Sequence, residues 1–376
     1  MTTRRKVFIA VSSMEGGGAE RVASTLANGW ADLGWNVTLV VSFSGRGKCS
    51  YVLAPAVRLV YLADMVPARC GRFVSRLARL WALRRLLRTA PPDNLVSFLP
   101  HVNVASVIAS RGTGVPVVVS ERTNPALDRE ATSMQRVLRR WLYRFADAVV
   151  IQTEGVRESV MRCAPGIRRI VVIPNPVPSS LAGTKAEVES GGRRRLIACG
   201  RLVPEKQFGG LLDTFANLKQ EFNQWDLWIW GEGPLRQELE HQVNARGLAG
   251  RVFLPGHTDS LWEEMQRADL FVLTSSVEGF PNALLEAMAA GIPAVSFDCD
   301  FGPREITCDG THGALARLND WPGLERALRA LMDDPLRRKQ LGENGSRAVR
   351  ERYSQVRVIG LWCDLLEELA PREVPS

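Results

Sequence analysis

Long hydrophobic runs are missing from this sequence of 376 residues. No uncharged apolar stretch reaches the roughly 18 residues that indicate a membrane-spanning helix. The first apolar run, VFIAV at 7–11, is also too short for the hydrophobic core of a signal peptide. We therefore expect a protein that is neither inserted in a membrane nor secreted and that works in the cytoplasm.

Paired cysteine patterns are missing as well. The seven cysteines are odd in number and scattered, without the CxxC or Cys/His spacing of zinc sites and disulfide-rich folds. They are Cys49, Cys70, Cys163, Cys199, Cys299, Cys308 and Cys363. We expect all of them to be reduced thiols.

Acidic residues are outnumbered, at 40 Asp and Glu against 48 Lys and Arg, which gives a formal net charge of +8. Such a charge attracts anions of every kind, so the total alone leaves nucleic acid, phosphorylated ligands and anionic lipid surfaces open. The position of the charge along the chain has to decide between them.

Between Met65 and Pro92 there is no acidic residue at all, and arginines alternate with large apolar residues. This pattern predicts a basic amphipathic helix at 69–88, and a second basic stretch, with Arg139 and Arg140, follows at 135–144. Such faces bind anionic lipid surfaces, although a helix with a solvated arginine face is the alternative. Nucleic acid binding is disfavoured because no recognised module or aromatic stacking platform accompanies the arginines.

What the sequence does contain is an alternation of short apolar runs with helical stretches. The candidate strands are 6–11, 36–43, 94–98, 116–120 and 147–152, then 196–199, 226–230, 251–254, 270–274 and 293–297. Strands that alternate with helices favour an α/β fold with parallel sheets. The chain is also longer than the roughly 250–300 residues at which a single core stops growing, so we expect two domains.

A polar stretch rich in Ser, Gly, Ala and Glu separates the two halves and lacks any periodicity, as linkers do. We expect an N-terminal domain at 1–178, a linker at 179–193 and a C-terminal domain at 194–354. The final helix, at 355–376, has no strand after it. It can pack on either domain, and we predict the N-terminal one.

A glycine-rich loop follows the first candidate strand and opens a helix. Gly16, Gly17 and Gly18 would let backbone amides and the helix dipole approach an anion. The GxGxxG fingerprint of dinucleotide-binding proteins, with its acidic residue after the second strand, is not matched. The loop alone leaves a ligand site and a simple tight turn equally open.

A second loop, GRLVPEK at 200–206, lies between a strand and a helix of the second half. Arg201 and Lys206 would both lie at the carboxyl edge of the sheet, where open α/β sheets bind ligands. Two cations beside a helix N-terminus suit a diphosphate, and an exposed basic loop is the alternative.

The most informative segment is EGFPNALLEAM at 278–288. Glu278 lies in the loop before a predicted helix and Glu286 in its second turn, and helical side chains lean back toward the N-terminus. A carboxylate among buried residues needs hydrogen-bond donors, such as the hydroxyls of a ligand. A helix residue paired with a neighbouring arginine is the alternative for Glu286.

Together these blocks make the sequence resemble glycosyltransferase family 4. The resemblance covers GGGAER at 16–21, IPNPV at 173–177, GRLVPEK at 200–206, WGEGPLRQELE at 230–240, 252–275 and 278–295. Blocks at 97–105, 117–125 and 297–306 bring it nearest to bacterial enzymes that act on lipid-linked or surface glycans, including the branch that transfers N-acetylgalactosamine. The resemblance implies the GT-B architecture, which is two facing Rossmann-like domains with a central cleft.

The resemblance also implies a catalytic set. Arg201 and Lys206 would stabilise the departing diphosphate of a nucleotide sugar, and Glu278 would contact the transferred sugar. The resemblance further implies that the anomeric configuration is retained, and our hypothesis is that a phosphate oxygen of the donor takes the proton of the acceptor. The donor-binding residues implied are Glu286 at the ribose, Gly279 and Phe280 at the sugar, and Gly16, Gly17 and Gly18 at the phosphate from the opposite domain.

The acceptor side departs from the family pattern. Many relatives place a histidine after the strand that here runs into VVVSERTNP, where this sequence has Arg122 beside Glu121. His101, after an earlier strand, is a further candidate for the cleft or a structural histidine. These three residues are our predicted acceptor-side set.

No metal or other cofactor is expected. Asp298, Cys299 and Asp300 form a DxD sequence like the one that binds a metal in another glycosyltransferase architecture. A turn before Phe301–Gly302–Pro303 explains it more simply.

The resulting expectation is a retaining hexosyltransferase that works at the inner face of the cell membrane. It would move a hexose or N-acetylhexosamine from a nucleotide sugar to a lipid-linked or surface-polysaccharide acceptor. We expect the nucleotide of the donor to be UDP. The alternatives are a nucleotide-sugar epimerase of the same fold and an inactive scaffold bound to the membrane.

Overall fold

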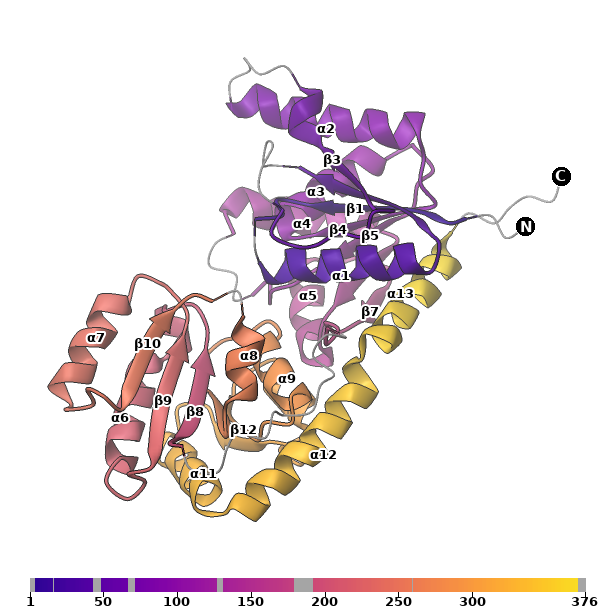
Figure 1. Cartoon of the computed structure of the whole chain (residues 1–376). Coiled ribbons are helices and arrows are strands. Elements are labelled where there is room, and N and C mark those ends of the chain that lie inside the picture. The colour runs from indigo at the N-terminus through magenta and orange to yellow at the C-terminus, as the bar shows by residue number, and fades with distance from the viewer. Residues whose placement is uncertain are drawn as a thin grey trace. The chain divides into compact units, whose positions relative to one another are not determined.

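The computed structural model of the chain describes residues 4–15, 17–42, 49–66, 72–126, 131–178, 192–258 and 260–370. The chain divides into two compact units, one formed by Met1–Pro176 together with Gln355–Ser376 and the other by Val177–Ser354. Each unit contains one parallel sheet with helices (Figure 1), so the predicted α/β class is confirmed. Across the described ranges, no helix is both long and apolar enough to span a bilayer.

The first unit is built on a seven-stranded parallel sheet in the order β3-β2-β1-β4-β5-β6-β7. Its strands are β1 Lys6–Val11, β2 Asn36–Val41, β3 Arg58–Tyr61, β4 Asn94–Phe98, β5 Val117–Ser120, β6 Ala148–Ile151 and β7 Ile170–Val172. Its helices are α1 Gly18–Asp32, η1 Leu62–Met65, α2 Arg72–Thr89, α3 Pro100–Ser110, α4 Ser133–Leu142, η2 Tyr143–Phe145, η3 Glu154–Val156, α5 Arg157–Cys163 and α13 Gln355–Leu369. The strand order reverses between β1 and β4, which is where such sheets form a ligand-binding crevice.

Buried apolar strands carry the core of the first unit. Ile9 of β1 lies in register with Leu39 of β2 and Val96 of β4, and all three are fully buried. Parallel strands that are covered on both faces need such continuous apolar runs. The last helix, α13, contributes to the same core, because Trp362 packs edge-on against Trp30 of α1 at 6.2 Å between ring centroids.

The second unit contains a six-stranded parallel sheet in the order β10-β9-β8-β11-β12-β13. Its strands are β8 Arg194–Cys199, β9 Trp225–Trp230, β10 Val252–Gly256, β11 Leu270–Leu273, β12 Ala294–Asp298 and β13 Ala314–Arg317. Its helices are η5 Pro204–Lys206, α6 Phe208–Leu218, α7 Arg236–Ala245, α8 Leu261–Gln266, α9 Asn282–Ala289, α10 Pro303–Thr307, α11 Trp321–Asp333 and α12 Pro335–Tyr353. Here the order reverses between β8 and β11.

Three strands were not predicted from the sequence, namely β3, β7 and β13. All three are edge strands of their sheets and are mostly half-buried. An edge strand is covered less completely, so its sequence does not need the long apolar run that identified the central strands.

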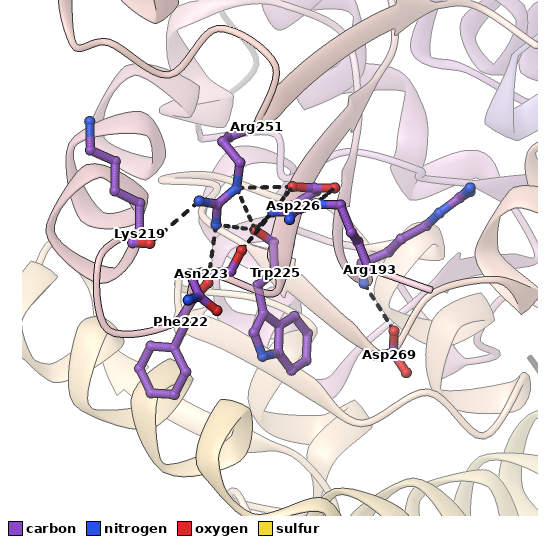
Figure 2. Close-up of polar contacts among 9 residues, drawn as sticks. Arg193, Lys219, Phe222, Asn223, Trp225, Asp226, Arg251 and Asp269 are labelled. Carbon is purple, nitrogen blue, oxygen red and sulfur yellow. Dashed lines mark hydrogen bonds and ion pairs between the residues drawn. The ribbon is translucent and has the colours of Figure 1, made fainter. Parts of the chain in front are cut away.

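A cluster of charged side chains closes the amino edge of the second sheet (Figure 2). Asp226, near the start of β9, accepts hydrogen bonds from Nε of Arg193 at 2.7 Å and from Nε of Arg251 at 3.0 Å. Arg251 also donates from Nη2 to the backbone carbonyl of Phe222 at 3.1 Å. These contacts join the residues that precede β8 and β10 to β9. The polar groups of this edge therefore bond one another, and the loops of the opposite, carboxyl edge carry the candidate site.

Candidate functional site

The loops after β8 and β11 flank the point where the strand order of the second sheet reverses. Lys206 ends the η5 turn, and its backbone carbonyl accepts a hydrogen bond from Oγ1 of Thr274 at 2.8 Å. The carbonyl of Glu205 accepts from the backbone N–H of Ser276 at 2.8 Å. Backbone contacts thus hold the two loops together and fix the side chains that they carry.

Lys206 and Glu278 form an ion pair across this reversal point. The distance from Nζ of Lys206 to Oε1 of Glu278 is 2.5 Å, and the side chains are 21% and 12% exposed. Partial burial strengthens such a pair relative to one on an open surface. The structure therefore brings together two of the residues that the sequence singled out, and it makes them partners of each other.

Glycines after β9 bring that loop against the loop after β8, backbone to backbone. A Cβ atom on Gly231, whose φ is +143°, would lie 1.9 Å from the carbonyl oxygen of Gly200. A Cβ atom on Gly233 would lie 2.5 Å from the carbonyl oxygen of Leu202. In the sequence these glycines were only part of a resemblance block, and this role was not predicted. The signal was their spacing directly after a strand.

Glu286 lies in the second turn of α9 and is 7% exposed. Burial raises the pKa of the thiol of Cys199 at the end of β8, and the negative charge of Glu286 raises it further. Burial, and then the charge of Glu278, raise the pKa of the Cys299 thiol to about 12. The two thiols lie at or just after the carboxyl ends of β8 and β12, and the negative charge of one of the two glutamates acts on each of them.

The remaining predicted residues of this unit differ in exposure. Arg201 is exposed, and its guanidinium donates no hydrogen bond to any residue in the described ranges. Gly279 is half-buried. The ring of Phe280 is buried and packs edge-on against Tyr353 at 6.0 Å between ring centroids, so this side chain belongs to the core of the unit.

In the first unit, Gly17 is the N-cap of α1 and Gly18 is its first residue, whereas Gly16 lies outside the described residues. The backbone N–H of Gly17 donates to the hydroxyl of Tyr51 at 2.8 Å. The carboxylate of Glu20 also packs against Gly17, because a Cβ atom there would lie 2.3 Å from Oε2 of Glu20. An anion that approached this helix end would have to displace both side chains.

Arg122, after β5, is a buried cation with few partners. Its Nη1 donates to Oδ1 of Asn175 at 2.5 Å, and its guanidinium lies 4.7 Å from the ring centroid of Phe98. Within the described structure its Nε and Nη2 atoms have no hydrogen-bond partner. Burial lowers the pKa of Arg122 to about 9. A buried guanidinium with two open donors fits an anionic group of a ligand.

Glu121 belongs to a buried polar network. It accepts a hydrogen bond from the hydroxyl of Tyr143 at 2.8 Å and lies 3.7 Å from Nη1 of Arg139. Asn103 donates to the same hydroxyl at 3.0 Å and accepts from Oγ of Ser97 at 2.8 Å. Burial raises the pKa of Tyr143 well above its usual range, and the negative charge of Glu121 adds to this effect. Arg139 is therefore not one of the surface arginines of the second basic stretch, which corrects that prediction.

His101 is the second residue of α3 and is half-buried. Burial, and then the nearby positive charge of Arg76, lower its pKa. A neutral imidazole is the consequence at neutral pH.

The DxD sequence begins at the last residue of β12, Asp298, which pairs with an arginine. Both side-chain oxygens of Asp298 accept hydrogen bonds from Arg304, the first of them from Nε at 3.2 Å. Asp300 is exposed. Among the residues that the structure describes, there is no group of three or more His, Cys, Asp or Glu side chains that could hold a metal ion.

Comparison with known proteins matches both units to described families. Residues 17–176 match the family described as glycosyl transferase 4-like domain, and residues 184–348 match glycosyl transferases group 1. An exopolysaccharide phosphotransferase of Streptomyces coelicolor is 32% identical over 301 residues, which are 77% of this chain and 30% of that protein. The chain thus spans less than a third of the length of that relative.

Other relatives match over nearly their whole length. The GalNAc-alpha-(1->4)-GalNAc-alpha-(1->3)-diNAcBac-PP-undecaprenol alpha-1,4-N-acetyl-D-galactosaminyltransferase of Campylobacter jejuni is 26% identical over 368 residues, 97% of this chain and 99% of that one. Among solved structures, the Anabaena protein HepE in complex with UDP and glucose has a TM-score of 0.80 at 19% identity. That match covers 97% of this chain and 100% of the other.

Proposed function

This chain belongs to the glycosyltransferases that join a 4-like domain to a group 1 domain, and from that premise we propose the reaction that it carries out. The family resemblance and the GT-B fold that the sequence predicted are confirmed by these matches. We propose that the enzyme retains the anomeric configuration and transfers a hexose or N-acetylhexosamine from a UDP-linked sugar. The proposed acceptor is a lipid-linked or surface polysaccharide at the inner face of the cell membrane.

The observation that carries this proposal is the Lys206–Glu278 pair at the reversal point of the second sheet, with the buried Glu286 on the helix α9 that follows the Glu278 loop. When a donor binds, Lys206 and Glu278 can each replace their contact with one another by a contact with the ligand. Lys206 would take the donor diphosphate together with Arg201, and Glu278 would take hydroxyls of the sugar. Glu286 would accept hydrogen bonds from the ribose.

The proposed chemistry follows from these roles. The bond between the anomeric carbon and the phosphate oxygen breaks, and its electron pair leaves with the diphosphate. The acceptor oxygen bonds to the same face of the anomeric carbon, while its proton passes to a phosphate oxygen of the donor. Arg201 and Lys206 stabilise the negative charge that develops, and one well-placed donor of this kind lowers a barrier by about 3–4 kcal/mol.

The proposed donor and acceptor have support among the relatives. The Anabaena structure contains UDP and glucose, which favours a UDP sugar. The Campylobacter enzyme is named for a glycan on undecaprenol diphosphate, which favours a lipid-linked acceptor. We also propose that the enzyme needs no metal ion, because Asp298 already pairs with Arg304.

One experiment tests the reaction as a whole. Lipid-linked glycans incubated with the protein and a panel of nucleotide sugars should gain one sugar, detected by mass spectrometry, with and without an excess of chelator. An isomerised donor without transfer would support an epimerase instead, and loss of the product in chelator would contradict metal-independent transfer.

A surface on the first unit supports the proposed membrane location. Trp81 on α2 and Trp141 on α4 are 66% and 56% exposed, and Arg144 stacks on the Trp141 ring at 5.1 Å. Their helices also expose Leu77, Met134, Val137, Arg76, Arg85, Arg88, Arg136 and Arg140. Exposed aromatic side chains among arginines suit the interface of an anionic bilayer.

We expect the protein to sediment with anionic vesicles at low salt and to be released at high salt, because screening weakens the attraction of the arginines. The double variant Trp81→Ser/Trp141→Ser should lose most of this binding. Leu336→Ser, which removes a similarly exposed apolar residue from the second unit, is the matched control and should bind normally. Sedimentation that ignores lipid charge would contradict the proposed location.

A further inference from the structure

A cavity of about 530 Å³ lies inside the first unit, between α2, α3 and α4 and the carboxyl ends of β1 and β2. Its wall is mostly aliphatic and includes Leu77, Leu80 and Leu83 of α2, Val104 and Ile108 of α3, and Leu138 of α4. This volume is in the range of pockets that hold small organic ligands. A nucleotide or a free sugar would leave most of its polar groups without partners on such a wall.

The polar residues that the structure describes in the wall of this cavity are all neutral or basic. Arg76, Arg79 and His101 line it, and no Asp or Glu is among the described residues of its wall. Arg79 is held in place, since its Nη1 donates to the carbonyl of Ser42 at 3.1 Å. Arg76 is exposed, and its side chain bonds to no residue in the described ranges. An occupant with an apolar body and an anionic end matches this distribution.

The cavity is also continuous with the proposed membrane surface. Leu77 and Met134 line the cavity and are at the same time among the most exposed apolar residues of α2 and α4. Arg76 and His101 both line the cavity, and the positive charge of Arg76 adds to the effect of burial in lowering the pKa of His101. A ligand that entered from a bilayer would meet these two groups at its charged end.

We infer that this cavity binds the apolar chain of a polyprenyl phosphate or diphosphate acceptor, with Arg76 and His101 at the phosphate. The inference rests on the proposed function and names the part of the acceptor that the first unit recognises. It assigns the cavity to the acceptor lipid and not to the phospholipids of the membrane.

The test is titration of the full-length protein with farnesyl diphosphate, farnesol and inorganic diphosphate. Farnesyl diphosphate should bind at least ten times more tightly than either of the other two. Farnesol lacks the charged diphosphate, and inorganic diphosphate lacks the apolar chain. A short-chain phosphatidylglycerol should compete only weakly. Equal or stronger competition by the phospholipid, or equal binding of inorganic diphosphate, would overturn the inference.

Two variants separate the chain from the charge. Ala105→Trp places a large ring in the cavity, and Arg76→Gln removes the exposed cation, so each should weaken farnesyl diphosphate at least tenfold. Arg85→Gln is the matched control, since Arg85 is exposed on the same helix but does not line the cavity. Unchanged UDP binding in every variant shows that the donor unit is intact.

The outcomes for the inference and for the proposed function are distinct. If sugar transfer occurs but Ala105→Trp and Arg76→Gln leave farnesyl diphosphate binding and the acceptor KM unchanged, the inference is wrong and the function stands. If both variants weaken farnesyl diphosphate but no lipid-linked glycan gains a sugar, the lipid site stands and the proposed reaction is wrong.

Discussion

Replacing Lys206 with methionine is expected to lower kcat/KM for sugar transfer by roughly 100- to 1000-fold. The methionine keeps most of the aliphatic stem that packs against Gly200 but removes the charge that would stabilise the departing diphosphate. The loss should fall mainly on kcat, since the charge on the diphosphate grows as the bond breaks. Steady-state kinetics with the donor identified by the nucleotide-sugar panel measures both constants.

Two further variants give this prediction its controls. Lys339→Met removes an exposed lysine from α12 and should leave kcat/KM unchanged. Lys206→Arg keeps the charge and should recover part of the activity, although the forked guanidinium cannot reproduce the position of the ammonium. Normal turnover by a folded Lys206→Met protein would contradict this role. Lys206 would then only form the ion pair with Glu278 and would not stabilise the diphosphate.

Replacing Arg122 with methionine is expected to make the protein more stable and less active. The buried guanidinium has one hydrogen bond, to Asn175, and two open nitrogens, so the free energy of its burial is only partly offset. An apolar side chain of similar length should raise the free energy of unfolding by about 1–3 kcal/mol. Transfer should fall at least tenfold, because we propose that an anionic group of a bound substrate completes the hydrogen bonds of Arg122.

Arg338 provides the matched control for Arg122. It is also a buried arginine, but its Nη1 donates to the carbonyls of Leu331 at 2.5 Å and Met332 at 2.9 Å. Arg338→Met should therefore destabilise the protein by about 1–3 kcal/mol, the opposite sign. Denaturant unfolding of the two variants measures the contrast. A destabilised Arg122→Met protein with full activity would make Arg122 a structural residue.

The sequence predicted the central strands because parallel strands covered on both faces need apolar runs such as those of β1 and β8. It did not predict the edge strands β3, β7 and β13, because half-buried edge strands do not need such runs; the edge strand β10 was predicted because it contains the apolar run Val252–Leu254. The place of the candidate site also followed from the sequence. Loops after central strands meet at the carboxyl edge, and this brought Lys206 and Glu278 into one small region.

The partners of the predicted residues could not be read from the sequence in the same way. Asn175 is 53 residues from Arg122, and Tyr143 is 22 residues from Glu121. Such contacts depend on how strands and helices pack, and no local pattern encodes them. Arg139 is a further example. Its basic neighbours in the sequence predicted an exposed side chain, but in the structure it is buried beside the carboxylate of Glu121.

The position of the donor can be measured most directly by a crystal structure of the protein with UDP bound. The expected result is that the diphosphate lies against Arg201 and Lys206 at the carboxyl ends of β8 and β11, that the ribose hydroxyls reach Glu286, and that Lys206 has left Glu278. UDP bound elsewhere, with the Lys206–Glu278 pair unchanged, would contradict the proposed donor site.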